Sequence, residues 1–193
     1  LRNDGQNLIF TGIDGVRVAQ KLVTVDGLNN DIDLIVPSKT VDKVNGLGWK
    51  DNTKVLVAYN DNMIELRSRF SVFRSQLLSG KYPDTSAFSD HPRNLHAQID
   101  KAELNAVISR MNALVTSKQA SIYIQFEPTC IKLTSVVQGK EQSVEYIDVH
   151  YHIDREDNEC ELNINGEFLR DSINQFMGDV IQLKIDTTDI TKP

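Results

Sequence analysis

Two histidines and two aspartates alternate along the segment DVHYHID, at Asp148, His150, His152 and Asp154. Residues two apart share one face of an extended strand, so these four side chains together have the composition of a divalent-metal site. The residues between them are apolar, which would give the strand an opposite, buried face. The pattern is therefore more simply that of a strand with one solvated face, because a metal site on a strand needs ligands and supporting groups from elsewhere. A metal-binding domain or metal-dependent enzyme is the alternative function that this segment suggests.

Other chemistry-bearing patterns are missing from the sequence. Cys130 and Cys160 are far apart and form no CxxC pair, which favours neither a zinc site nor a disulfide framework. The sequence also contains no GxxxxGK[ST] loop, no HExxH helix and no nucleophile elbow. We therefore predict a non-catalytic protein without a cofactor, in a reducing, cytoplasmic compartment.

Size and charge limit the class of protein to which the chain can belong. The 193 residues include 40% apolar ones, enough for a substantial core. The 27 acidic and 21 basic residues give a net charge of -6, which argues against a wholly basic nucleic-acid coat but leaves room for a local positive face. No apolar run is long enough to cross a bilayer. The chain begins with a leucine and no signal-peptide pattern, so we expect it to be part of something longer.

Three stretches share one order of elements, which is a short strand, a short amphipathic helix, a strand, a tight turn and another strand. The third stretch stops early, at Pro193. The three cover residues 33–70, 96–136 and 160–190, here called the first, second and third repeats. Val36, Ile99 and Ile164 occupy the same place in each, at separations of 63 residues (36 to 99) and 65 residues (99 to 164). Between the first two repeats, residues 78–94 carry glycine, proline and small polar residues, and are the best candidate for a domain boundary.

Each predicted helix has a single apolar stripe, and each following strand alternates. The helix stripes are Val41, Val44 and Leu47; Leu104, Val107, Ile108, Met111 and Val115; and Leu169, Ile173 and Phe176. In the second repeat, Ile122, Ile124 and Phe126 alternate along the strand. A unit with one such helix cannot bury its core alone. We therefore predict an α+β fold in which neighbouring repeats share antiparallel sheets, with helices on one side.

Four segments in order resemble a known family. TGIDGVRVA, IVPSKTVDKV, SGKYPD and LNINGEFLRDSINQF are similar to the A-T-D-G-H-R-L-A segment, the V-P-R-K helix entry, the G-[RK]-[FY]-P-D linker and the I-G-F-N-x-x-Y-L-x-D-x-L helix entry of the bacterial sliding clamp, the beta subunit of DNA polymerase III. The similarity covers essentially the whole chain.

The resemblance implies a DNA-clamp fold, with helices on the inner face of a ring and antiparallel sheets outside. Residues 1–90 would be a partial middle domain, and residues 91–193 the C-terminal domain without its final strand. Two protomers would close a ring around duplex DNA without reading its sequence. Short peptide motifs of the polymerase catalytic subunit and the clamp loader would dock on it, in a cytoplasmic, nucleoid-associated setting.

The resemblance also implies a partner-peptide pocket between the middle and last domains. Carried over by position, it is lined by Ile13, Gly15, Val16, Arg17, Val18, Pro83 and Phe88. Gly15 would permit close backbone approach, and Arg17 would offer donors at the rim. Read without the resemblance, Asp14-Gly15 is simply a hairpin turn and Arg17 a solvated strand residue. Val16 and Ala87 depart from the family's usual histidine and arginine.

The same resemblance gives DNA-facing and ring-forming residues. The DNA-facing set is Lys39, Lys43, Lys101, Arg110, Lys118 and Arg170, and the ring interface is Leu114 and Val115. Acidic residues alternate with these cations, so ordinary solvated helix faces are the other interpretation. Leu114 and Val115 could equally complete the stripe of their own helix. Ser38 replaces the arginine of V-P-R-K, and we expect it to cap the helix.

Overall fold

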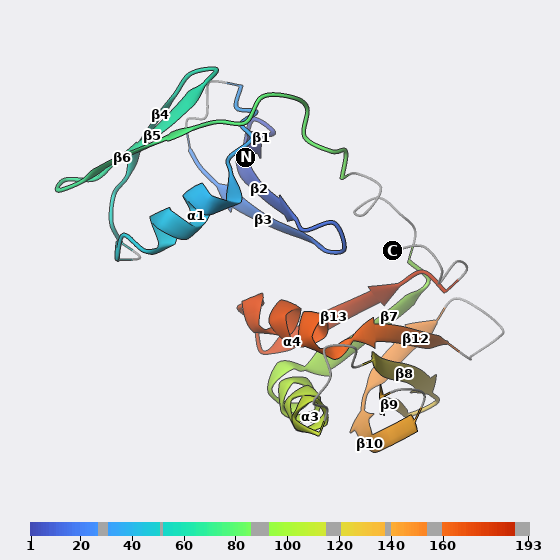
Figure 1. Cartoon of the computed structure of the whole chain (residues 1–193). Helices are drawn as coiled ribbons and strands as arrows, with labels where there is room; N and C mark the ends of the chain where they lie inside the picture. The colour runs from blue at the N-terminus through green and yellow to red at the C-terminus, as the bar shows by residue number, and fades with distance from the viewer. Residues whose placement is uncertain are drawn as a thin grey trace. The chain divides into compact units, whose positions relative to one another are not determined.

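The computed structural model describes residues 1–26, 31–50, 52–85, 93–114, 121–137, 140–153 and 160–187. The chain forms two compact units, Leu1–Ser89 (unit 1) and Asp90–Pro193 (unit 2). Within the described residues there are three helices and thirteen strands, and every strand pairing is antiparallel (Figure 1). The α+β class is confirmed. None of the helices in these ranges is long and apolar enough to cross a membrane.

The described residues of unit 1 form two three-stranded sheets and one helix. Its elements are β1 (Arg2–Asn3), β2 (Asn7–Ile13), β3 (Val18–Thr24), α1 (Ser38–Asn45), β4 (Leu56–Tyr59), β5 (Met63–Arg67) and β6 (Val72–Gln76). The sheets have the orders β1-β2-β3 and β4-β5-β6. Among its described residues only Ile9, Leu34 and Ile64 are buried apolar side chains. Strand pairing therefore contributes much of the order in unit 1.

The helix of the first repeat corrects three expectations. Pro37 occupies the N-cap position with no side-chain hydrogen bond, so Ser38 does not cap α1 and instead begins it. Thr40, not Val41, is the buried residue of the helix, and its hydroxyl lies 2.6 Å from the Ser75 hydroxyl. The helix ends at Asn45, so Leu47 falls outside the predicted stripe and is exposed.

The predicted strand before this helix is also absent. Val36 lies outside every strand, and the residues before it form two isolated bridges only, Asp33 with Arg2 and Ile35 with Leu78. Pro37 follows at once and has no N–H, so the ladder cannot extend through it. The equivalent residues of the other repeats lie in strands, Ile99 in β7 and Ile164 in β12.

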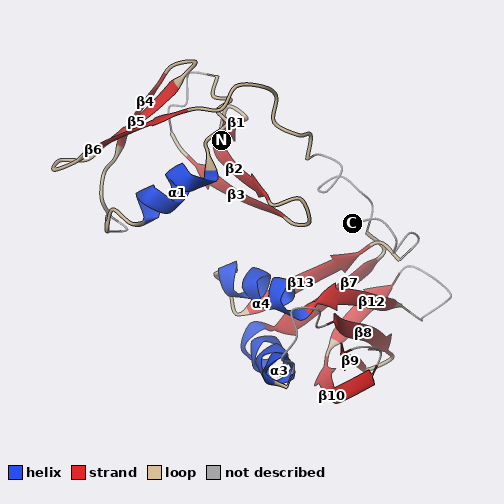
Figure 2. Ribbon diagram, in the orientation of Figure 1, coloured by secondary structure: helices blue, strands red, loops and turns tan. Residues whose placement is uncertain are grey.

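In unit 2 the part of the chain that the structure describes forms two sheets and two helices. Its elements are β7 (Leu95–Asp100), α3 (Lys101–Ala113), β8 (Ser121–Glu127), β9 (Cys130–Val137), β10 (Lys140–Asp148), β11 (His150–Ile153), β12 (Glu161–Asn165), α4 (Gly166–Gln175) and β13 (Val180–Ile185). The sheets have the orders β10-β9-β8-β12 and β11-β7-β13. Helices α3 and α4 lie together on one side of the strands (Figure 2).

The second and third repeats share both sheets, as predicted. β12 pairs with β8, placing Leu162 opposite Ile124, and β13 pairs with β7, placing Ile181 opposite Ile99. Each of the two helices therefore follows a strand of one sheet and precedes a strand of the other. This arrangement closes one core beneath both helices.

The core of unit 2 follows the predicted stripes with one exception among the described residues, which do not include Val115. Leu104, Val107, Ile108 and Met111 on α3 are all buried, and so are Ile122, Ile124 and Phe126 on β8. On α4, Ile173 is buried and Leu169 packs against the core. Phe176 is 53% exposed, because the helix has already ended and its backbone at this residue is extended.

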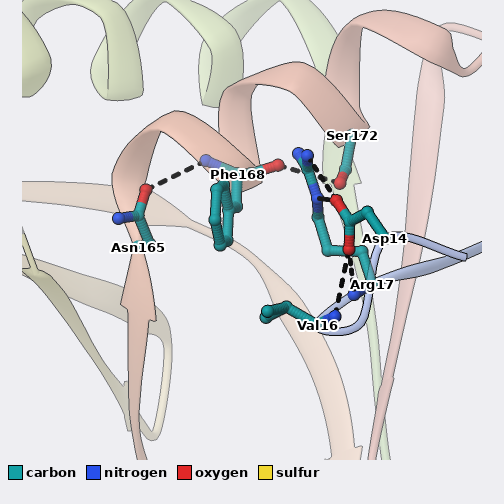
Figure 3. A network of polar contacts seen from close by, with 6 residues as sticks. All are labelled: Asp14, Val16, Arg17, Asn165, Phe168 and Ser172. Atoms are coloured by element: carbon teal, nitrogen blue, oxygen red, sulfur yellow. Dashed lines mark hydrogen bonds and ion pairs between the residues drawn. The ribbon is translucent and has the colours of Figure 1, made fainter. Parts of the chain in front are cut away.

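Both helices begin at side-chain caps that the stripe analysis did not identify. The Asp100 carboxylate accepts a hydrogen bond of 2.8 Å from the Glu103 N–H at the start of α3. At the start of α4, Asn165 Oδ1 accepts from the N–H groups of Glu167 and Phe168 at 2.9 and 3.1 Å (Figure 3). Asp and Asn are strong N-cap residues, so each strand turns directly into its helix.

Gly166 sets the distance between the two helices of unit 2. The Asn112 side-chain amide of α3 donates a 3.0 Å hydrogen bond to the Gly166 carbonyl of α4. A Cβ at this glycine would lie 2.3 Å from Asn112 Oδ1 and 2.8 Å from Ile122 Cδ1. Any side chain here must therefore push α4 away from α3 or displace a buried isoleucine.

We expect Gly166→Val to lower the free energy of unfolding of unit 2 by about 1–3 kcal/mol, the usual cost of overpacking. Urea denaturation followed by circular dichroism measures this change. Glu167→Val is the matched control, since it puts the same β-branched residue on an exposed site of the same helical turn. Equal destabilisation by both variants would contradict the proposed tight contact.

Candidate functional site

The β2–β3 turn is a four-residue loop organised by one carboxylate. Ile13 pairs with Val18, and Asp14 to Arg17 connect them. Asp14 Oδ1 accepts hydrogen bonds from the backbone N–H groups of Val16 at 3.0 Å and Arg17 at 2.7 Å (Figure 3). Gly15 has a φ of +89°, which an L-residue rarely adopts. The hairpin interpretation of Asp14-Gly15 is thus correct at the level of the backbone.

The side chain of Arg17 is bound to the same carboxylate. Its Nε donates to Asp14 Oδ2 at 2.8 Å, and one terminal nitrogen lies 2.7 Å from that oxygen. The backbone N–H groups of Arg17 and Val16, followed by the Arg17 side chain, lower the pKa of Asp14 to about 2. Some of the Arg17 donors that we expected at the rim of the pocket therefore bind Asp14 within the turn.

Apolar side chains flank this turn on the surface of unit 1. Val16 is 67% exposed and Ile13 is 37% exposed, while Val18 is half-buried. Pro83 is exposed, and the preceding Tyr82 donates from its hydroxyl to the Thr11 carbonyl of β2 at 3.1 Å. The segment containing Pro83 is thereby fixed to the strand that leads into the turn.

Two residues qualify the predicted pocket. The predicted pocket did not include Tyr82. Its place directly before the linker proline, Pro83, could have indicated that it belongs to the site. Phe88 lies outside the described residues. The structure brings Gly15, Val16 and Arg17 together in one turn, with Ile13 and Val18 at the strand ends that flank it.

The predicted DNA-facing cations differ in their exposure and in the contacts that they make within the chain. Lys39 and Lys43 are exposed on successive turns of α1, and Arg170 is half-buried on α4. Lys101 donates from its ammonium to the Phe176 carbonyl at the end of α4. Lys118 lies outside the described residues.

Arg110 is held by a bidentate ion pair. Its Nε and a terminal nitrogen donate to the two Glu145 oxygens of β10 at 3.0 and 2.9 Å. The pair raises the pKa of Arg110 and lowers that of Glu145, each chiefly through these hydrogen bonds. Because its donors already face a carboxylate, Arg110 has less to offer a phosphate than its position on α3 suggests.

Leu114 does not complete the helix stripe. It lies at the C-cap of α3, where its N–H reaches the Asn112 and Met111 carbonyls, and its side chain is 59% exposed. The buried stripe of the described helix thus ends at Met111. Val115 lies outside the described residues.

The alternating Asp/His segment is divided between two sheets. Asp148 ends β10, whereas His150 begins β11 in the other sheet, with the buried Val149 between them. The expectation of one continuous strand with four ligands on a face is therefore wrong, because the chain changes sheets at Val149. Asp154 lies outside the described residues. Within the described ranges no group of three or more His, Cys, Asp or Glu side chains is placed to hold a metal ion.

Comparison with known families matches both units. The family model for the DNA polymerase III beta subunit, central domain, matches residues 1–84, and the model for its C-terminal domain matches residues 91–193. A Beta sliding clamp of Staphylococcus aureus (strain Mu50) is 22% identical over 183 residues, covering 92% of this chain and 46% of that protein. The chain spans about half the length of such relatives.

Solved structures show the same fold. The DNA polymerase III subunit beta of Pseudomonas aeruginosa aligns with a TM-score of 0.86 at 20% identity, covering 96% of this chain and 51% of that one. The DNA polymerase sliding clamp of Bacillus subtilis aligns with a TM-score of 0.85 at 17% identity, covering 95% and 48%. The clamp fold expected from the four segments is confirmed.

We expect the Asp14 carboxyl to titrate with a midpoint of about 2. Because its pKa is lowered on folding, its contribution to the turn is present above the ordinary value of 3.8 and is lost as the pH falls from there towards 2. Carboxyl ¹³C NMR measures the midpoint, and amide exchange at Val16 and Arg17 reports opening of the turn. A midpoint near the ordinary value, unchanged by Arg17→Gln, would contradict this organisation.

Proposed function

Because this chain belongs to the DNA polymerase III beta subunit family through its central and C-terminal domains, we propose that it forms part of a DNA sliding clamp. The two domain models matching in order along the chain are the observation that carries the proposal. A clamp acts by encircling duplex DNA, so its partners stay on the template without a tight grip on the sequence. In this role the protein is a non-catalytic accessory subunit in the cytoplasm, associated with the nucleoid.

The proposed domain assignment follows the two family matches. Residues 1–90 are assigned to the middle domain and residues 91–193 to the C-terminal domain of a clamp protomer. Two protomers close the ring, and we assign Leu114 and Val115 to the interface between them. The large exposed fraction of Leu114 supports this role, because an apolar residue at a helix end gains most from a covering partner.

The partner-peptide site is assigned to the β2–β3 turn and the linker. Its residues are Ile13, Gly15, Val16, Arg17, Val18, Pro83 and Phe88. Exposed apolar side chains on a turn fixed by hydrogen bonds form a preorganised surface, which lowers the entropic cost of binding. The occupants would be short peptide motifs of the polymerase catalytic subunit and the clamp loader.

We expect a fluorescent peptide of the Gln-x-x-Leu-Phe kind to bind saturably, with Val16→Asp and Pro83→Ala each weakening it by about tenfold or more. Fluorescence anisotropy measures the affinity. Val57→Asp is the matched control, because Val57 is also an exposed valine of unit 1 but lies in the β4-β5-β6 sheet, away from the β2–β3 turn. Equal losses in Val16→Asp and Val57→Asp would count against the assigned site.

The DNA-facing set comprises Lys39, Lys43, Lys101, Arg110, Lys118 and Arg170. Phosphate contacts from such side chains are independent of sequence and sensitive to salt. The intramolecular partners of Arg110 and Lys101 limit the strength of these contacts. Weak contacts suit a protein that must move along the duplex, because strong ones would hold it in place.

We expect Lys43→Gln to reduce the salt dependence of duplex binding by about one phosphate contact, and Arg110→Gln to change it less. The reason is that Glu145 already holds the Arg110 guanidinium. Glu145→Gln should instead strengthen duplex binding by releasing that guanidinium. Anisotropy of a labelled duplex over a series of salt concentrations gives the slopes, and a larger effect of Arg110→Gln than of Lys43→Gln would overturn this ranking.

A further inference from the structure

Three of the four histidines of the chain gather on one face of the β11-β7-β13 sheet. Alternate residues of β7, Leu95, Ala97 and Ile99, are buried in the core of unit 2, so His96 and Gln98 point to the opposite, solvent side. We call the exposed set His96, Gln98, His150, His152, Gln182 and Lys184 the histidine face. This face is directed away from the core that α3 and α4 cover.

Strand register arranges the histidine face in two rows. His152, His96 and Lys184 lie directly opposite one another across β11, β7 and β13. His150, Gln98 and Gln182 form the adjacent row in the same way. Directly opposite side chains have Cβ atoms about 4.5–5.5 Å apart, so each row spans only about 10 Å.

These side chains surround an open hollow of about 750 Å³. Among the described residues, the titratable and charged ones in its lining are Asp100, His96, His150, Tyr151, His152 and Lys184. Asp100 is the one carboxylate among the described residues of this lining, and one of its oxygens accepts the Glu103 N–H that caps α3. The described part of the lining is therefore richer in hydrogen-bond donors than in negative charge.

One hydrogen bond fixes the tautomer of the central imidazole. His96 Nε2 lies 2.8 Å from the Arg93 carbonyl oxygen, which can only accept, so Nε2 carries the hydrogen. A second proton must then be added at Nδ1. Protonated imidazoles, an ammonium and carboxamide N–H groups are all donors that suit a tetrahedral oxyanion.

We propose that the histidine face binds phosphate-bearing anions, and that it binds them more tightly as its imidazoles take up protons. Imidazoles ordinarily gain their charge between pH 8 and 5. His96 sits between His152 and Lys184, so protonating the row places like charges side by side, and an anion relieves their repulsion. By linkage, anion binding must in turn favour protonation.

Imidazole ¹H–¹³C NMR of the intact chain tests the proposal, with inorganic phosphate and sulfate as probes at constant ionic strength. Sulfate keeps its charge over this range, so a change in its affinity with pH reports on the protein alone. We expect saturable shifts of His96, His150 and His152 at about pH 6, and affinity about fivefold or more weaker at about pH 8. Shifts reproduced by sodium chloride, or sulfate affinities equal at both pH values, would overturn the proposal.

Variants locate the effect on the face. His96→Gln and Lys184→Gln should each weaken binding by about threefold or more, whereas Lys21→Gln, which removes a strand lysine from unit 1, should not. Equal losses from Lys184→Gln and Lys21→Gln would show only general charge attraction and would reject the site.

A short DNA duplex as a third probe identifies the source of the phosphate. If the duplex perturbs the same imidazoles and Lys184→Gln removes the effect, the ligand is a nucleic-acid backbone. If phosphate perturbs them and the duplex does not, the ligand is a free phosphate or a small phosphorylated molecule. Both results support the phosphate chemistry, and neither depends on the helix-borne lysines assigned to the proposed clamp function.

Discussion

The core of unit 2 depends on the pairing of two strands from the third repeat with two strands from the second. β12 adds to the edge of β8 and β13 adds to β7, so the helix between β12 and β13 must cross from one sheet to the other. That path brings α4 against α3 over Gly166, where no side chain fits. Neither repeat could bury its apolar stripe without this exchange of strands. The long sequence separation of the pairings makes the whole unit cooperative, because losing one strand exposes both helices.

This dependence explains which features could be predicted from the sequence. A helix such as α3, with four buried residues at helical spacing, and a strand such as β8, with three at alternating spacing, carry their burial in the local pattern. The apolar stripe predicted for α1 was wrong because Thr40 is the buried residue, through a hydroxyl contact with Ser75. A pattern of hydrophobic residues does not indicate such a contact. The prediction of one continuous strand through Asp148–His152 was wrong because the chain changes sheets at the buried Val149, although the alternating sequence pattern continues through it.

Prediction from the sequence was limited in a related way for the charged residues of the candidate surfaces. The sequence placed Arg17 on the expected turn, and Lys101 and Arg110 on the expected helix. It did not identify the groups that these side chains bind. Asp14 precedes Arg17 by three residues, so that contact could have been anticipated as a local turn interaction. Glu145 is 35 residues from Arg110, and the Phe176 carbonyl is 75 residues from Lys101. Such pairings exist only once the strands and helices have assembled, so the charge available to a partner is a property of the fold.

The two faces of the β11-β7-β13 sheet can therefore have separate roles. Alternation along β7 buries Ile99 in the core and exposes His96 on the other side, so the two faces present different side chains. The helix side carries the permanent charges of lysine and arginine, whose attraction for phosphate depends on salt and little on pH. The histidine face depends on imidazoles, so its attraction for anions must depend on pH as well. The rigid strands between them hold both sets of side chains in fixed register. The cations of α3 and α4 and the proposed anion site on the histidine row would thus respond to different conditions within unit 2.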